Sequence, residues 1–155
     1  MQHALRISRK IEYGLRAMAC LASLGEGEVL SFREIARRMD VPETFLAKIL
    51  KTLVSRKLVR STRGAQGGYR LGRPGKEISF LDVIEAVEGP ILINLCTSDE
   101  HDACKMSSAC TLHGVWRLGQ ERMVEVYRSV SVEQLAMHNL KPSVMAPLRP
   151  VAASS

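Results

Sequence analysis

The chain has 155 residues, of which 46% are hydrophobic and 25% are charged, with a formal net charge of +6 at pH 7. This composition is ordinary for a soluble globular protein, and the length predicts one domain with an appendage. A membrane-spanning helix is not expected, because no apolar run in the sequence reaches about 18 residues. Residues 1–10 are polar and lack the apolar core of a signal peptide, so we expect a cytoplasmic protein.

The charge is unevenly divided along the chain. Residues 1–76 hold 16 Lys and Arg against 6 Asp and Glu, a net charge of +10. Residues 77–155 hold 6 against 10, a net charge of −4. A basic half favours a polyanionic partner such as nucleic acid, and an acidic half predicts a different task. An unevenly charged surface without such a partner is the alternative.

Three helices are predicted in the basic half. Between residues 8 and 24 apolar side chains recur every three or four positions, with Ser8 as a plausible N-cap. Ser31 and Glu34 form a capping box that begins a short second helix. After a tight turn, Pro42 suits the first position of a third helix. Two short helices joined by a tight turn form the helix-turn-helix pattern.

A β-hairpin is predicted directly after these helices. Residues 58–61 and 69–71 are expected to be its strands, and residues 63–68 its glycine-rich turn. Residues 1–78 then form a winged helix-turn-helix domain, completed by a helix at 79–89. The expected fold class is mainly α with a small β-hairpin.

The acidic half is predicted to contain a loop, a long helix and a tail. Residues 90–111 show no clear period, residues 112–140 form a long helix and a short capped one, and residues 141–155 are a disordered tail. Apolar residues and one glycine of the long helix alternate at an average period of 3.5, which is typical of helix–helix packing. The expected dimer interface consists of Leu112, Trp116, Gly119, Met123, Val126 and Val130.

The second helix of a helix-turn-helix places its N-terminal residues against base edges in the major groove. Here Glu43 and Thr44 are candidates for reading bases, and Lys48 and Lys51 are candidates for binding phosphate. Phe45, between them, is expected to be a core residue. The predicted partner is therefore double-stranded DNA.

The hairpin supplies further candidates for DNA contact. Arg63 lies at its tip and suits insertion into a minor groove, while Gly64 and Gly67 let the backbone approach DNA. Tyr69, at the start of the return strand, is grouped with them. A surface hairpin without DNA contacts is the alternative.

Three cysteines and a histidine lie within eighteen residues: Cys96, Cys104, Cys110 and His113. Thiolates favour zinc, Cu(I) and iron–sulfur clusters, and clustered thiols in a reducing compartment more often bind metal than form disulfides. The gaps of seven and five residues are looser than a zinc knuckle, which favours an iron–sulfur cluster over zinc. A redox-active dithiol and unligated thiols are further alternatives. Cys20 is expected to be a buried core thiol.

The chain resembles the IscR/NsrR/RirA group of bacterial winged-helix regulators, often called the Rrf family. The resemblance covers about residues 5–140 and depends on four motifs. These are the opening Arg-Ile-Ser-Arg-Lys-Ile-Glu-Tyr-Gly-Leu-Arg-Ala-Met, the wing Arg-Gly-x-x-Gly-Gly-Tyr-x-Leu, the helix from Ser79, and three cysteines before a long helix. It implies a homodimer with an iron–sulfur cluster held by Cys96, Cys104 and Cys110.

The resemblance leaves the fourth ligand open. IscR-like members use a histidine placed like His113, whereas NsrR-like members use a carboxylate of the other subunit, placed like Glu12. The gap of seven residues after Cys96 is similar to the RirA type. Both 2Fe-2S and 4Fe-4S clusters occur in this group, and some members lack the cysteines and the cluster.

We therefore expect a homodimeric transcriptional repressor controlled by a cluster that senses iron or cluster status, redox state or nitric oxide. The alternative is a zinc or iron–sulfur protein that stores or transfers metal without binding DNA. An enzyme is not expected, and no catalytic residue is assigned. The sequence has no evident nucleophile–base pair, phosphate loop beside a helix or pair of catalytic carboxylates.

Overall fold

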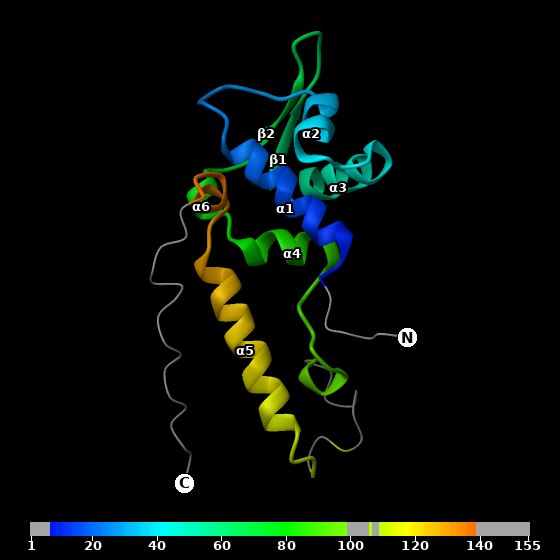
Figure 1. Ribbon diagram of the computed structural model, residues 1–155, viewed down its shortest axis with the longest axis vertical. Helices are drawn as coiled ribbons and strands as arrows, with labels where there is room; N and C mark the ends of the chain where they lie inside the picture. Colours follow the sequence, from blue (N-terminus) through cyan, green and yellow to red (C-terminus); the bar gives the residue numbers. More distant parts are fainter. Residues whose placement is uncertain (1–6, 99–105, 107–108, 139–155) are drawn as a thin grey trace.

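The computed structural model describes residues 7–98, 106 and 109–138, which form a helical body from which one long helix projects (Figure 1). The body contains α1 (Arg9–Ala22), α2 (Phe32–Met39), α3 (Glu43–Ser55), the hairpin β1 (Val59–Thr62) and β2 (Gly68–Leu71), the turn η1 (Gly75–Glu77) and α4 (Phe80–Glu88). There follow η2 (Leu95–Thr97), the long α5 (His113–Ser129) and the short α6 (Val132–Ala136). The predicted fold class is confirmed. Within the described ranges, no helix is long and apolar enough to cross a bilayer.

Serine side chains begin several of these helices, as the sequence predicts. Ser8, Ser31, Ser79 and Ser131 each accept a hydrogen bond from the backbone N–H three residues later. The last three also form reciprocal capping boxes, with Glu34, Asp82 and Gln134. Such boxes satisfy two backbone donors that a helix end otherwise leaves without partners.

Two helix boundaries differ from expectation. Pro42 is the N-cap of α3, and the first helical residue is Glu43. Helix α6 ends at Ala136, earlier than the predicted end near residue 140. The predicted tail at 141–155 lies outside the described residues.

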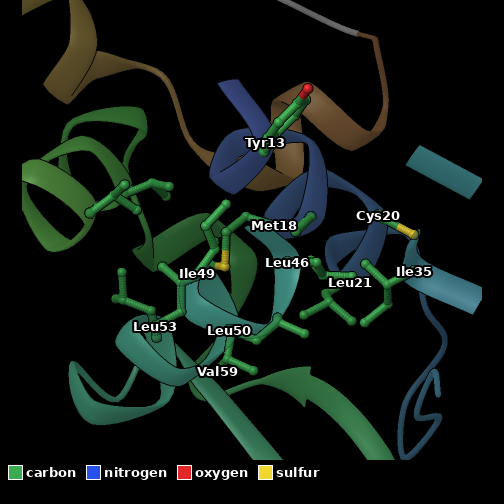
Figure 2. Packing of buried hydrophobic residues seen from close by; sticks show 14 of the residues in the cluster. Tyr13, Met18, Cys20, Leu21, Ile35, Leu46, Ile49, Leu50, Leu53 and Val59 are labelled. Carbon is green, nitrogen blue, oxygen red and sulfur yellow. The ribbon is translucent and has the colours of Figure 1, made fainter. Parts of the chain in front are cut away.

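The core lies between α1 and α3 (Figure 2). Met18 of α1 and Leu46 and Leu53 of α3 are fully buried, and Ile49 and Leu50 are 1% exposed. Helices α2, α4 and α6 also pack against α1, which makes α1 the central helix of the body.

Cys20 belongs to this core and is only 5% exposed, which confirms the prediction of a buried thiol. Its burial raises the pKa of the thiol above the ordinary value. Because the thiolate is the form that binds metal and reacts, Cys20 is unsuited to either role.

The hairpin is joined to the body at its base. Val59 pairs with Leu71 and Ser61 with Tyr69, in antiparallel register. Leu30, before α2, also exchanges backbone hydrogen bonds with Tyr69, at 2.8 and 3.0 Å. Gly68 allows this approach, because a Cβ there would lie 2.4 Å from the Leu30 carbonyl oxygen.

Helix α5 extends away from the body, and none of its residues is buried (Figure 1). Near its end, the Tyr127 ring lies 4.9 Å from that of Phe80 in α4, measured between centroids. In the part of α5 farther from the body, Val115 and Trp116 are exposed, and Leu118 is half-buried.

Candidate nucleic-acid interface and metal centre

The outward face of α3 carries the residues predicted to contact DNA. Glu43, Thr44, Lys48 and Lys51 are all exposed, while the apolar stripe of the same helix faces the core. Because α3 follows α2 after a short turn, it has the place of a recognition helix. Two lysines on this exposed face give it a positive charge.

Phe45 contradicts the sequence prediction, because it is 51% exposed and not a core residue. Its ring contacts Tyr13 edge-on, with centroids 6.0 Å apart. The buried stripe begins one position later, at Leu46, so Phe45 lies beside it and faces outward. A large apolar side chain is therefore exposed among the candidate DNA contacts.

The tip of the hairpin is exposed at Arg63 and Gly64, as predicted for a wing. Gly64 has a φ of 119°, which favours glycine. A Cβ on Gly67 would lie 2.3 Å from the carbonyl oxygen of Thr62. Both glycines are thus explained by the turn itself, without a DNA contact. Tyr69 is partly buried and packs against the core, so it has a structural role in the wing base.

Arg60 and Arg70 are basic residues that the sequence reasoning missed. They lie opposite each other across the hairpin, and both are exposed. Like charges in this position repel, and no acidic side chain pairs with either arginine in the part of the chain that the structure describes. Their pairing extends the positive charge from the wing tip toward the body. That Arg60 and Arg70 lie opposite each other follows from the strand register and is not evident from the sequence alone.

Of the candidate metal ligands, His113 is the first residue of α5, and Cys96 and Cys110 lie in segments next to that helix. Cys96 is part of η2 and Cys110 precedes α5, and both are half-buried free thiols. The backbone N–H of His113 donates to the Cys110 carbonyl at 3.3 Å, so these two residues share one turn. Cys104 lies outside the described residues.

The imidazole of His113 has an unsatisfied nitrogen. Its Nδ1 atom is buried and has no hydrogen-bond partner among the residues that the structure describes. Buried polar atoms nearly always have a hydrogen-bond partner or another ligand. A metal ion can take this place, because neutral imidazole nitrogen is a common metal ligand. Thiolate sulfur and imidazole nitrogen are both ligand types of soft-metal and iron–sulfur sites. Among the described residues alone, however, no three His, Cys, Asp or Glu side chains form a metal-binding group.

Glu12, the other candidate for a fourth ligand, already has a partner in its own chain. It is half-buried on α1 and accepts a hydrogen bond from Arg16, one helical turn later. A role as ligand would require Glu12 to give up this ion pair.

The predicted dimer seam corresponds in part to an exposed face of α5. Leu112 is 58% and Trp116 38% exposed, and a Cβ on Gly119 would meet only Ile93, at 3.8 Å. Met123 and Val126 are half-buried.

Val130 does not belong to this face. It is 7% exposed, and its carbonyl accepts from the Phe80 backbone N–H at 2.7 Å. Its backbone is extended because α5 has already ended, so the helical period no longer determines its direction.

Comparison with known proteins identifies relatives along nearly the whole chain. The sequence model of the Rrf2 family, described as iron-dependent transcriptional regulators, matches residues 7–138. A protein of Mycobacterium tuberculosis H37Rv, described as an HTH-type transcriptional regulator, is 36% identical over 132 residues, covering 85% of this chain and 81% of its own. Protein aau3 of Rhizobium meliloti is 31% identical and covers 84% of each chain.

Solved structures give the same result. The global cysteine regulator CymR of B. subtilis matches with a TM-score of 0.71 and 29% identity, covering 88% of this chain and all of its own. IscR of T. potens matches with a TM-score of 0.70 and 28% identity, covering 94% and 95%. These similarities place the chain among regulators of transcription.

Proposed function

Because the chain belongs to the Rrf2 family of transcriptional regulators, we propose that it represses transcription as a homodimer whose DNA binding is controlled by an iron–sulfur cluster. The observation that carries the cluster proposal is the buried Nδ1 of His113, which has no partner within the described ranges and lies one turn from Cys110. The fold supports the DNA-binding part, because it combines an exposed basic α3 with a wing.

In this proposal α3 reads the major groove and the hairpin enters the adjacent minor groove. Glu43 and Thr44 contact bases, and Lys48 and Lys51 bind phosphate. The exposed ring of Phe45 adds a third candidate for base contact, since an apolar side chain can contact the methyl group of thymine. Arg63 inserts at the wing tip, with Gly64 and Gly67 shaping the turn.

The cluster would be held by Cys96, Cys104, Cys110 and His113. We favour His113 over Glu12, because no described residue is a partner of the histidine nitrogen, whereas the Glu12 carboxylate has one. A bound cluster supplies a centre that is sensitive to iron supply, oxidation and nitric oxide. Binding or loss of the cluster would move the segment that carries its ligands. This movement would change the fraction of dimers whose two α3 helices have the spacing of the two operator half-sites.

A second candidate is a cysteine-responsive regulator that works without a cluster. It is favoured by the similarity to the global cysteine regulator of B. subtilis, at a TM-score of 0.71. It predicts a colourless protein whose duplex affinity is independent of iron.

Anaerobic purification followed by visible absorption, iron and sulfide analysis separates these candidates. We expect a coloured protein that contains iron and sulfide, and loss of both in Cys104→Ala. A colourless protein with stoichiometric zinc, or with no metal, would overturn the cluster proposal.

Duplex binding is tested separately, by fluorescence anisotropy at two salt concentrations with DNA selected from a random pool. Regulator function predicts an affinity that falls steeply with salt and weakens in Arg63→Ala. The absence of any salt-sensitive duplex affinity would favour metal storage or transfer without DNA binding.

A further inference from the structure

Gln120 of α5 makes hydrogen bonds to the chain on both sides of Cys96. Its Oε1 accepts from the backbone N–H of Ile93 at 2.9 Å, and its Nε2 donates to the carbonyl of Thr97 at 3.2 Å. Oε1 also lies 2.6 Å from the Thr97 hydroxyl oxygen. One half-buried amide thus joins α5 to a segment 23 to 27 residues earlier in the chain.

These partners determine the orientation of the amide. The Ile93 N–H needs an acceptor, and the Thr97 carbonyl needs a donor, so exchanging Oε1 and Nε2 would break both bonds. The Thr97 hydroxyl has one proton for two acceptors, Gln120 Oε1 and the Asn94 carbonyl at 2.7 Å. The Thr97 side chain therefore belongs both to η2, which contains Cys96, and to the contact with α5.

The same region is packed by apolar atoms. The Ile93 side chain lies alongside Gly119, where an added methyl group would stand 3.8 Å from Ile93 Cδ1. Gly119 precedes Gln120 and belongs to the exposed seam of α5. The segment carrying Cys96 thus rests on the helix that carries the candidate dimer interface.

We propose that Gln120 is a positioning residue that couples the Cys96 segment to α5, so that ligand binding at Cys96 alters the placement of the long helix. The inference deepens the proposed function and rests on its cluster. Thr97 follows Cys96 directly, so a movement of the thiol toward or away from a cluster strains the bonds to Gln120. By thermodynamic linkage, DNA binding that fixes the placement of α5 also changes the affinity of the Cys96 segment for the cluster.

The Gln120 contact itself can be tested on the cluster-free protein by amide hydrogen exchange. Gln120→Leu removes both the acceptor and the donor, and we expect the Ile93 amide to exchange at least tenfold faster, with the helix content of α5 unchanged. Glu121→Leu is the matched control, because Glu121 is exposed and pairs only along the helix with Arg117. Wild-type exchange at Ile93 in Gln120→Leu would overturn the proposal.

The coupling is tested by the ratio of duplex affinities with and without the cluster. In Gln120→Leu we expect this ratio to move at least threefold toward one, with cluster-free affinity within twofold of wild type. Gln120→Glu keeps the acceptor for Ile93 and loses the donor to Thr97, so its ratio should be intermediate. A merely structural role would lower stability without changing the ratio.

The outcomes distinguish the two proposals. If the wild type takes up iron and sulfide but Gln120→Leu keeps its affinity ratio, the coupling is wrong and the proposed function stands. If the wild type takes up neither, the proposed function fails and the coupling fails with it.

Discussion

His113 and Glu12 differ in the partners that each already has. The Nδ1 atom of His113 is buried and has no partner in the part of the chain that the structure describes, whereas Glu12 forms an i, i+4 ion pair with Arg16. An unpartnered buried nitrogen costs free energy that a metal bond would recover, while using Glu12 as a ligand would break an existing interaction. These partners favour a cluster site formed within one chain.

Replacing His113 with Ala should change the visible spectrum of the anaerobic protein and accelerate loss of iron to a chelator severalfold. Glu12→Gln should leave both unchanged, because the amide oxygen still accepts from Arg16. Absorption and electron paramagnetic resonance spectra of the two variants are the measurement. A normal His113→Ala spectrum beside an altered Glu12→Gln spectrum would instead indicate a site shared between subunits.

Phe45→Ala should weaken binding to the selected operator by about fourfold, the factor expected from about 0.8 kcal/mol for one buried methyl group. The salt dependence of binding should not change, because an apolar contact releases no counterion. Lys48→Gln should instead reduce the salt slope by about 1. Anisotropy titrations at several salt concentrations separate the two effects.

The contact itself is tested by replacing operator thymines one at a time with deoxyuridine, which lacks only the methyl group. One replacement should weaken the wild type and leave Phe45→Ala unaffected. If every replacement affects the two proteins equally, Phe45 does not read a methyl group.

Phe45 also illustrates what sequence alone could not predict. The apolar positions between Leu46 and Leu53 recur at helical spacing and correctly predict the buried face of α3. Phe45 lies one position before these residues and is also apolar, so its residue type predicted a buried side chain. Its exposure depends on the side of α3 that meets α1, which is set by packing between distant segments.

Among the helices, the cap at the start of α2 predicts how the stability of the fold depends on pH. The Ser31 side chain, donating to Glu34, holds the pKa of that carboxyl below its ordinary value of 4.5, with a smaller contribution from the Ser31 backbone N–H. A lowered folded-state pKa stabilises the fold above the unfolded pKa, and this contribution is lost as pH falls through the folded pKa.

In Ser31→Ala the pKa of Glu34 should therefore rise toward the ordinary value, and unfolding should depend less on pH below about 4.5. Removing the cap should also lower stability at neutral pH by about 1 kcal/mol. Carboxyl NMR titration and urea unfolding at several pH values check these effects. An unchanged Glu34 titration would contradict the assigned cause.

The base of the wing predicts a large effect from one added methyl group. Gly68→Ala places a Cβ against the Leu30 carbonyl, at 2.4 Å before relaxation, so we expect a loss of about 1–3 kcal/mol in the free energy of unfolding. Gly114→Ala is the control, because nothing lies within 4 Å of its Cβ position, on the exposed surface of α5. Urea unfolding of both variants is the measurement, and equal stabilities would contradict the close approach of Leu30 to Gly68.

Elements were predictable from sequence where their cause is local. The capping serines Ser31, Ser79 and Ser131 act on backbone within three residues, so their helices begin as expected. The requirement for glycine at position 68 comes from Leu30, which is distant in the chain, and a single sequence does not contain that contact. The Arg60–Arg70 pair likewise follows from strand register.

For the whole molecule, the uneven charge predicts that DNA binding and sensing use different parts of the chain. Residues 7–76, which hold most of the basic side chains, form much of the body that carries α3 and the hairpin (Figure 1). Cys110 precedes α5 at the end of that helix far from the body, and η2, which contains Cys96, contacts α5 at Gln120. Within one chain, α5 and the segment between α4 and η2 join the candidate ligands to the body. Val130, buried at the junction of α5 and the body, would anchor that helix to the DNA-binding part.

The exposed seam of α5 predicts that this face forms the dimer interface. Monomeric proteins rarely leave large apolar side chains along one helix face, and Leu112 and Trp116 are exposed one turn apart. A glutamate at position 116 would have to be desolvated in a helix–helix interface, which is costly without a partner charge. Trp116→Glu should therefore sediment as a monomer at concentrations where the wild type is a dimer.

Its affinity for an operator with two half-sites should fall at least tenfold, whereas affinity for a single half-site should change little, because only the dimer binds both half-sites at once. Gly114→Glu is the matched control, since position 114 faces away from position 116 by about 200° on an ideal helix. Analytical ultracentrifugation and anisotropy with both duplexes give the test. If Trp116→Glu stays dimeric, the subunits associate through another surface, and the exposed face of α5 has a different occupant.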